Sequence, residues 1–114
     1  MSIVKKAIEK YEGRVIPFTC TSEVTVGDVI PLGASMVGIA VNSGLTGEVI
    51  SLEIEKVWTI TAATADAIEI GSVVYWDDTN KVITTTDAGN TWAGRALSSK
   101  AVGVAGVVDV KINV

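Results

Sequence analysis

Two glycine pairs have the spacing that begins a phosphate-binding loop, in residues 33–38 and 89–94, with four residues between the glycines. A working loop continues with Lys, which reaches the phosphates, and with Ser or Thr, which holds magnesium. Here the following residues are Ile39-Ala40 and Arg95-Ala96, and neither segment leads into a pattern typical of a helix. The sequence therefore argues against nucleotide hydrolysis.

Three other sets of residues could carry chemistry, and each lacks a partner that the chemistry needs. Residues 77–80, Asp-Asp-Thr-Asn, offer oxygen ligands to calcium, but the glycine and distal glutamate of a calcium loop do not follow. Glu53 and Glu55 could pair as acid and base, yet alternation places them on a solvated strand face. Cys20 has no histidine in the chain to activate it, so we expect a buried core thiol. We predict no catalytic residue, no cofactor and no metal.

The composition narrows the function classes further. The chain has 114 residues, enough for one domain with its own core. Hydrophobic residues make up 48% and charged residues 19%, which excludes global disorder. No apolar run approaches the roughly 18 to 20 residues of a membrane span. The net charge of −4 argues against nucleic acid, which binds basic surfaces. We expect a soluble, acidic domain that contacts neither membrane nor nucleic acid.

The elements that must position any site are rich in Val, Ile and Thr, which favour strands. Apolar and polar residues alternate in six segments: 16–20, 37–41, 48–60, 72–76, 81–86 and 108–114. Short alternating segments separated by glycine-containing turns are typical of antiparallel sandwiches and barrels. We predict an all-β fold: a single small antiparallel β-barrel or β-sandwich of about eight strands, with a short N-terminal arm or helix.

Individual positions make the fold prediction more specific. Pro17 cannot donate to a ladder, so its segment should be an edge strand or a bulge. From residue 48 to 60 the alternation indicates one strand with an apolar and a polar face. Residues 77–80 should close a hairpin, because Asp and Asn bond their own backbone in turns. The regular final segment, up to Val114, should pair inside a sheet.

Two features could form an interface with another protein. Residues 1–11 have apolar residues at helical spacing but are too short for a stable isolated helix, so they form either a docked helix or an arm that orders on contact. Residues 12–114 form the β-rich domain. Three tryptophans are unusual beside one Phe and two Tyr; they suit interface hot spots, and core filling explains them equally well. The candidate interface residues are Ile3, Val4, Ile8, Tyr11, Trp58, Trp76 and Trp92.

A succession of short motifs follows the order found in a known protein family. The motifs are Val26-Gly27-Asp28-Val29, Val37-Gly38-Ile39-Ala40, Gly47-Glu48, Gly71-Ser72-Val73-Val74-Tyr75-Trp76-Asp77 and Gly89-Asn90-Thr91, followed by Gly94 and the terminal strand. The series resembles the capsid decoration, or cement, proteins of tailed phages and prophages, long labelled predicted RecA/RadA-type recombinases. The resemblance covers roughly residues 11–114, and the Val-Tyr-Trp-Asp segment is its most specific piece.

The resemblance implies an all-β structural protein on the outside of a phage head. It implies binding to the major capsid protein after the shell expands, often as a symmetric oligomer, with a trimer favoured and a dimer or monomer as alternatives. The location would be the capsid surface of the virion, and the host cytoplasm during assembly. A tail or baseplate β-module would share this composition. A nucleotide-binding recombination accessory is disfavoured, because the Lys and Ser/Thr of a phosphate loop are missing.

Overall fold

A computed structural model of the protein describes residue 7 and residues 10–114, and these residues form strands and turns without a helix. The strands are β1 (Val15–Thr19), β2 (Val29–Pro31), β3 (Val37–Ala40), β4 (Val49–Glu53), β5 (Val57–Ala62), β6 (Val73–Asp77), β7 (Val82–Thr84), β8 (Thr91–Ala96) and β9 (Gly106–Ile112). The all-β prediction is confirmed. No helix in the described part of the chain is long and apolar enough to cross a membrane.

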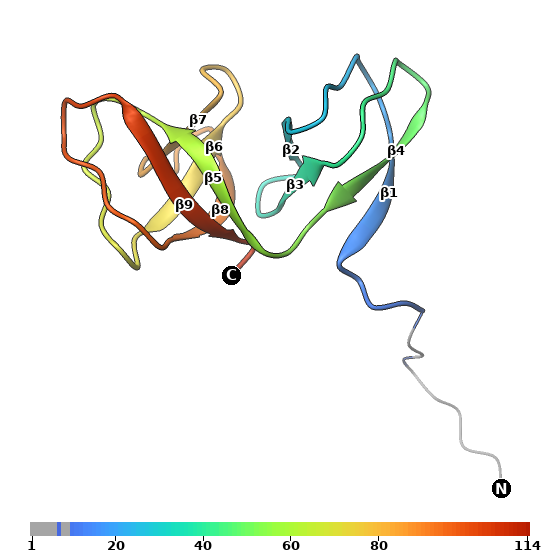
Figure 1. The fold of residues 1–114 in the computed structure, drawn as a ribbon, viewed down its shortest axis with the longest axis horizontal. Helices are drawn as coiled ribbons and strands as arrows, with labels where there is room; N and C mark the ends of the chain where they lie inside the picture. The colour runs from blue at the N-terminus through green and yellow to red at the C-terminus, as the bar shows by residue number, and fades with distance from the viewer. Residues whose placement is uncertain (1–6, 8–9) are drawn as a thin grey trace, which may run out of the picture.

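The strands form two sheets, which we call the open sheet and the barrel. The open sheet has the order β1-β4-β3-β2, with antiparallel neighbours throughout. The barrel has the order β5-β7-β6-β8-β9, and it closes because β7 pairs in parallel with β5, Ile83 opposite Ala62. Figure 1 shows the two sheets side by side, with the open sheet in blue to green. Among the described strands, β1 and β2 therefore each keep one unpaired edge.

Three detailed predictions are confirmed. β1, which contains Pro17, lies at an edge of its sheet. β6 and β7 form the hairpin around residues 77–80. β9 pairs with β5 on one side and β8 on the other. It ends at Ile112 instead of Val114, because Asn113 has a φ of +61°, which turns the chain out of the ladder.

The prediction of a single strand from residue 48 to 60 is wrong. β4 ends at Glu53 and β5 begins at Val57, and Lys56 between them has a φ of +82°. A left-handed residue interrupts the extended backbone, and here it carries the chain from the open sheet into the barrel. Apolar and polar residues go on alternating across the break, which is why the sequence pattern hides it.

The open sheet and the barrel share one topology, which sequence inspection did not reveal. β1, β2, β3 and β4 correspond to β5, β6, β8 and β9, with the same antiparallel neighbours. The register is also the same, since Val15 lies opposite Glu53 as Val57 lies opposite Lys111. The chain therefore contains an internal repeat of two units with the same topology, residues 14–54 and residues 56–112. Only the second unit has the additional strand β7.

The turns before equivalent strands are alike. Gly27 before β2 and Gly71 before β6 have φ values of +94° and +91°, which favour glycine. Their N–H groups donate to the carbonyls of Ala40 and Ala96, one on each of two equivalent strands. In both turns the polar side chain after the glycine accepts a bond from the backbone N–H three residues earlier. The repeat therefore extends to individual hydrogen bonds.

Two glycines at equivalent ladder positions lie where a side chain would collide with the neighbouring strand. Gly38 in β3 has the Cβ and Cδ1 of Leu52 3.0 Å from where its own Cβ would lie. Gly94 in β8 has the carbonyl oxygen of Lys111 in that place, and its φ of +145° is accessible to glycine. A larger residue at either position would push neighbouring strands apart.

The turn before β9 contains a buried lysine. Lys100 is 8% exposed, and its Nζ donates to the carbonyl oxygens of Thr64, Ala101 and Val104 at 3.2, 2.9 and 2.8 Å. Three charge-assisted bonds of this kind hold two loops together. Backbone carbonyls alone thus provide a site for an ammonium group in this fold.

Two hydrophobic cores lie on the two faces of β3. Val37 and Ile39 point into the large core, which also holds Ile83 and most of the barrel interior. Ala40 points the other way, into the smaller core of the open sheet around Leu52. All four residues of β3 are buried. The strand therefore belongs to both halves of the molecule and fixes how they pack.

Asn113 ties the end of the barrel to β3. Its Oδ1 accepts from the N–H of Val37 at 2.9 Å, while its Nδ2 donates to the carbonyls of Val37 at 2.9 Å and Ile54 at 2.8 Å. The side-chain amide thus pairs with the backbone of a fully buried residue as a strand neighbour would. The left-handed φ of Asn113, which Asn tolerates better than most residues, is compatible with this bridge.

We predict that Asn113→Gly lowers the free energy of unfolding by about 3 kcal/mol, because buried backbone groups lose their partners while the left-handed backbone is kept. Asn113→Asp should cost at least as much, since a carboxylate cannot donate to the two carbonyls. Urea unfolding followed by tryptophan fluorescence measures both. Asn42→Gly is the control, because Asn42 is exposed and makes one such bond. An equal or smaller loss at Asn113 would contradict the bridge.

Candidate functional site

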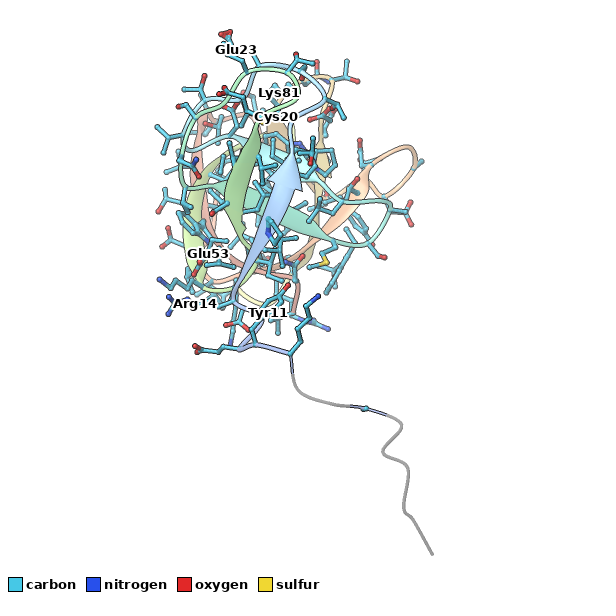
Figure 2. All side chains as sticks on the ribbon, turned by 90° about the vertical axis from the view of Figure 1, so that its right-hand side faces the viewer. Tyr11, Arg14, Cys20, Glu23, Glu53 and Lys81 are labelled. Atoms are coloured by element: carbon cyan, nitrogen blue, oxygen red, sulfur yellow. The ribbon has the colours of Figure 1, made fainter. Side chains whose placement is uncertain are left out.

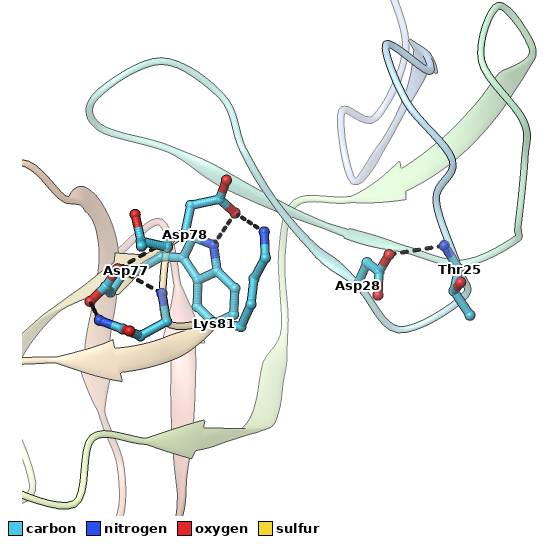
Figure 3. Close-up of polar contacts among 8 residues, drawn as sticks. Thr25, Asp28, Asp77, Asp78 and Lys81 are labelled. Carbon is cyan, nitrogen blue, oxygen red and sulfur yellow. Dashed lines mark hydrogen bonds and ion pairs between the residues drawn. The ribbon is translucent and has the colours of Figure 1, made fainter.

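A cleft of about 570 Å³ lies between the open sheet and the barrel. Its apolar lining includes Phe18, Val29, Ile30, Pro31, Trp58, Ile60 and Trp76, and its charged lining is Glu23, Asp28, Asp78 and Lys81. Figure 3 shows the polar groups of the two sides, with Asp28 and Thr25 on the open-sheet turn and Asp78 and Lys81 on the barrel. The cleft combines an apolar floor with acidic walls.

Asp78 joins an indole and an ammonium group on the barrel wall. Its Oδ1 accepts from the Nε1 of Trp76 at 3.0 Å and from the Nζ of Lys81 at 2.8 Å. The hydrogen bond from Lys81, and then that from Trp76, holds the pKa of Asp78 below its ordinary value of 3.8. An ionised Asp78 therefore fixes Trp76, which both lines the cleft and belongs to the barrel core.

Asp77 uses its carboxylate inside the hairpin turn. It accepts from the backbone N–H groups of Thr79 and Asn80 at 3.0 and 3.1 Å, and from the Asn80 side chain at 2.8 Å. The bond from the Asn80 side chain is the main cause of the lowered pKa of Asp77. The turn interpretation of residues 77–80 is confirmed, and both carboxylates bind groups of this hairpin.

The structure brings two of the three tryptophans to the cleft. Trp58 is half-buried and its Nε1 donates to the carbonyl of Glu55, while Trp76 is buried. Tyr75 is half-buried on the opposite face from Trp76, as adjacent strand residues require. Trp92 does not line the cleft, and its backbone N–H donates to the carbonyl of Ala34. Core filling thus accounts for Trp76, and an interface role for the tryptophans stays a prediction.

The candidate residues of the arm fall into two groups. Tyr11 is 50% exposed and lies at the end of β1 remote from Cys20 and Glu23, as Figure 2 shows. Ile3, Val4 and Ile8 lie outside the described residues.

The two glycine-rich segments pack as ordinary strand and loop. The loop between β2 and β3 is held to β8, because the Oγ1 of Thr91 donates to the carbonyl of Gly33 at 3.1 Å. Gly94 lies inside β8, against the neighbouring backbone. Neither segment forms a ring of free N–H groups before a helix, which is the geometry that cradles phosphate.

A family model for phage cement proteins matches residues 10–112. The chain belongs to the phage cement protein family. It is accordingly a phage structural protein associated with the virion capsid. No curated protein and no solved structure matches the chain. The matched range spans both units of the repeat and the whole lining of the cleft.

The prediction that Glu53 lies on a solvated strand face is wrong. Glu53 is 4% exposed instead of solvated, whereas Glu55 is exposed as predicted. The Oε1 of Glu53 lies 3.4 Å from the Nε of Arg14 and 3.3 Å from the Nζ of Lys56. Lys56 reaches the carboxylate from the turn after β4, and Arg14 reaches it from the residue before β1, which pairs with β4; Figure 2 shows Glu53 beside Arg14. The two glutamates therefore form no acid–base pair.

The prediction of a buried core thiol is confirmed, because Cys20 is 2% exposed. The described residues contain no cluster of His, Cys, Asp or Glu able to hold a metal ion.

Sequence reasoning missed the open-sheet side of the cleft, above all Ile30 and Pro31. The only signal there was Pro31 itself, since proline is confined to edge strands and bulges.

We predict that the indole N–H resonance of Trp76 titrates with a midpoint below 3.8, because Asp78 loses its charge only below that ordinary pKa. A lowered carboxyl pKa contributes stability that is present at neutral pH and is lost as the pH falls through the folded-state pKa. NMR spectra recorded from pH 6 downward measure the midpoint. Asp78→Asn should remove the titration, and Asp109→Asn should leave it. A midpoint at or above 3.8 would contradict the bond to Lys81.

Proposed function

We propose that this protein decorates the outside of a phage head, binds the major capsid protein after the shell expands, and stabilises the expanded lattice. It would act on the capsid surface and reside in the host cytoplasm until assembly. The observation that carries the proposal is the cement-family match over both units. The resemblance of the glycine-turn motifs to capsid decoration proteins supports it from the sequence side.

The described side chains suit a binding role better than catalysis. Asp77 and Asp78 are occupied by their own turn, and Glu53 is enclosed by two cations. Cys20 is buried without a base beside it. We infer that the protein acts without turnover, cofactor or metal. Stabilisation would come from apolar area buried across joints between capsomers and from added strand pairing.

A symmetric homo-oligomer is part of the proposal. Closed symmetry suits a protein that occupies equivalent sites on a lattice. A trimer is favoured, with a dimer or a monomer as alternatives. Tyr11, Trp58 and Trp92 keep exposed surface and are the aromatic residues we place at contacts with the shell or between subunits.

We predict that the purified protein sediments with expanded, undecorated heads and protects them from heat or dilution. Heads before expansion are the matched control, because they lack the mature lattice. Binding that saturates at a fixed ratio per capsomer would support the proposal. Binding to isolated tails instead would favour a tail or baseplate module, and hydrolysis of ATP by the pure protein would favour the recombination accessory.

We predict that deletion of residues 2–10 leaves the β-domain folded but weakens head binding or oligomer formation. The segment carries Ile3, Val4 and Ile8 among three lysines, and it is too short to fold alone. A melting curve and a head-binding assay are measured on the same preparation. The control keeps the length and composition of residues 2–10 in scrambled order. A sharp loss of stability would make the segment part of the core, and no change in either assay would make it a passive tail.

A further inference from the structure

The first unit lacks the strand that closes the second. In the barrel, β7 lies between β5 and β6, and Ile83 on it is fully buried. The equivalent strands of the first unit are β1 and β2, and their facing edges have no strand between them. Phe18 and Ile30 line the cleft beside those edges. The cleft therefore contains the place that a β7 equivalent would occupy.

Burial at equivalent positions shows what the missing strand leaves uncovered. Phe18, Ile30 and Leu32 are half-buried at the margin of the open-sheet core. Their counterparts in the barrel are Ile60, Val74 and Trp76, which are 8%, 0% and 5% exposed. The difference follows from β7, whose Ile83 packs in the same core as all three counterparts. An aliphatic side chain entering from the cleft would complete the core of the first unit.

The two free edges offer more acceptors than donors. Ser51 directs its backbone toward β3, so Pro17 opposite it faces the free edge of β1. The same alternation turns Pro31 to the free edge of β2. Proline contributes a carbonyl but no N–H, which discourages pairing with an arbitrary strand. A segment rich in donors is favoured, and Lys100 shows that carbonyls alone satisfy an ammonium in this fold.

The charges that line the cleft indicate which kind of segment would bind there. Three carboxylates, on Glu23, Asp28 and Asp78, face one ammonium, on Lys81, and that ammonium is paired with Asp78. The occupant is therefore expected to be cationic. The sequence before Tyr11 has this character, with three lysines against one glutamate. It also contains two adjacent aliphatic residues, Ile3-Val4, as β7 contains Val82-Ile83.

We propose that residues 2–8 of a second copy of this chain occupy the cleft as an extended segment beside β2, with Ile3 in the place that Ile83 takes in the barrel. The direction of β7 requires a second copy. It runs parallel to β5, so its counterpart runs parallel to β1. Residues 2–8 of the same copy, joined to the start of β1 by only the six residues 9–14, would run antiparallel to β1 instead. Each subunit then donates to the next, a head-to-tail contact that closes into a ring such as a trimer.

The test uses the full chain in solution, without heads. A photo-crosslinking benzoylphenylalanine replaces Ile3, and isotopically light and heavy copies are mixed so that mass spectrometry identifies links between copies. We expect links from position 3 of one copy to residues 16–32 of the other. Placing the same group at the exposed position of Val49 should give no such links. Links confined to one copy, links elsewhere, or none would overturn the proposal.

A charge-reversal variant distinguishes binding in the cleft from non-specific electrostatic attraction between copies. Glu23→Lys should reduce the yield of these links by about fivefold, as expected for one lost attraction and one new repulsion at an exposed position. Glu69→Lys makes the same change on an exposed turn of the barrel away from the cleft, and should leave the yield unchanged. Equal yields in the two variants would overturn the proposal. Both experiments use the free protein. A negative result would therefore overturn this proposal without deciding whether the protein binds phage heads, which the sedimentation assay tests separately.

Discussion

The side-chain amide of Asn113 bonds the end of the barrel to both β3 and the segment that crosses between the two halves of this protein. β3 is buried on both faces, but its first residue, Val37, has no strand partner on the barrel side. Asn113 fills that place with one donor and one acceptor, and it reaches Ile54 just before the chain crosses between the sheets. The bridge thus joins the start of β3 and the last residue before the crossing, Ile54, to the end of the barrel, on whose core Ile39 also packs.

Much of the fold was predictable because alternation reports burial directly. β9 and the β6–β7 hairpin follow from period-two patterns and from Asp and Asn in a turn. The break at Lys56 was not, since a left-handed lysine leaves no compositional trace and the apolar pattern continues past it. The internal repeat was also hidden. Its shared features are mainly backbone ones, such as the positive φ values of Gly27 and Gly71, while most side chains at matched positions differ.

The candidate site was less predictable than the fold. Trp58 and Trp76 were singled out by type and do line the cleft, but Trp92 has the same type and lies elsewhere. Glu53 was predicted to be solvated because alternation shows only which face of a strand a residue lies on. It does not show whether other residues cover that face. The burial of Glu53 depends on Lys56, which belongs to a turn that the pattern did not show, and on Arg14, which precedes β1 and lies beside the end of β4. The acidic walls arise from residues far apart in the sequence, such as Glu23 and Asp78, and only the packing of two sheets assembles them.

The position of the Asn113 bridge sets an order of events on the ribosome. The strands of the first unit are synthesised before any of the second, so β1 to β4 are able to pair early. The outer face of β3, with Val37 and Ile39, stays uncovered until the barrel strands exist, and Val37 waits 76 residues for its amide partner. Nascent chains thus pass through a stage that exposes both an apolar face and two strand edges, a combination prone to misassembly. Proline on each of those edges limits pairing between nascent chains during that interval.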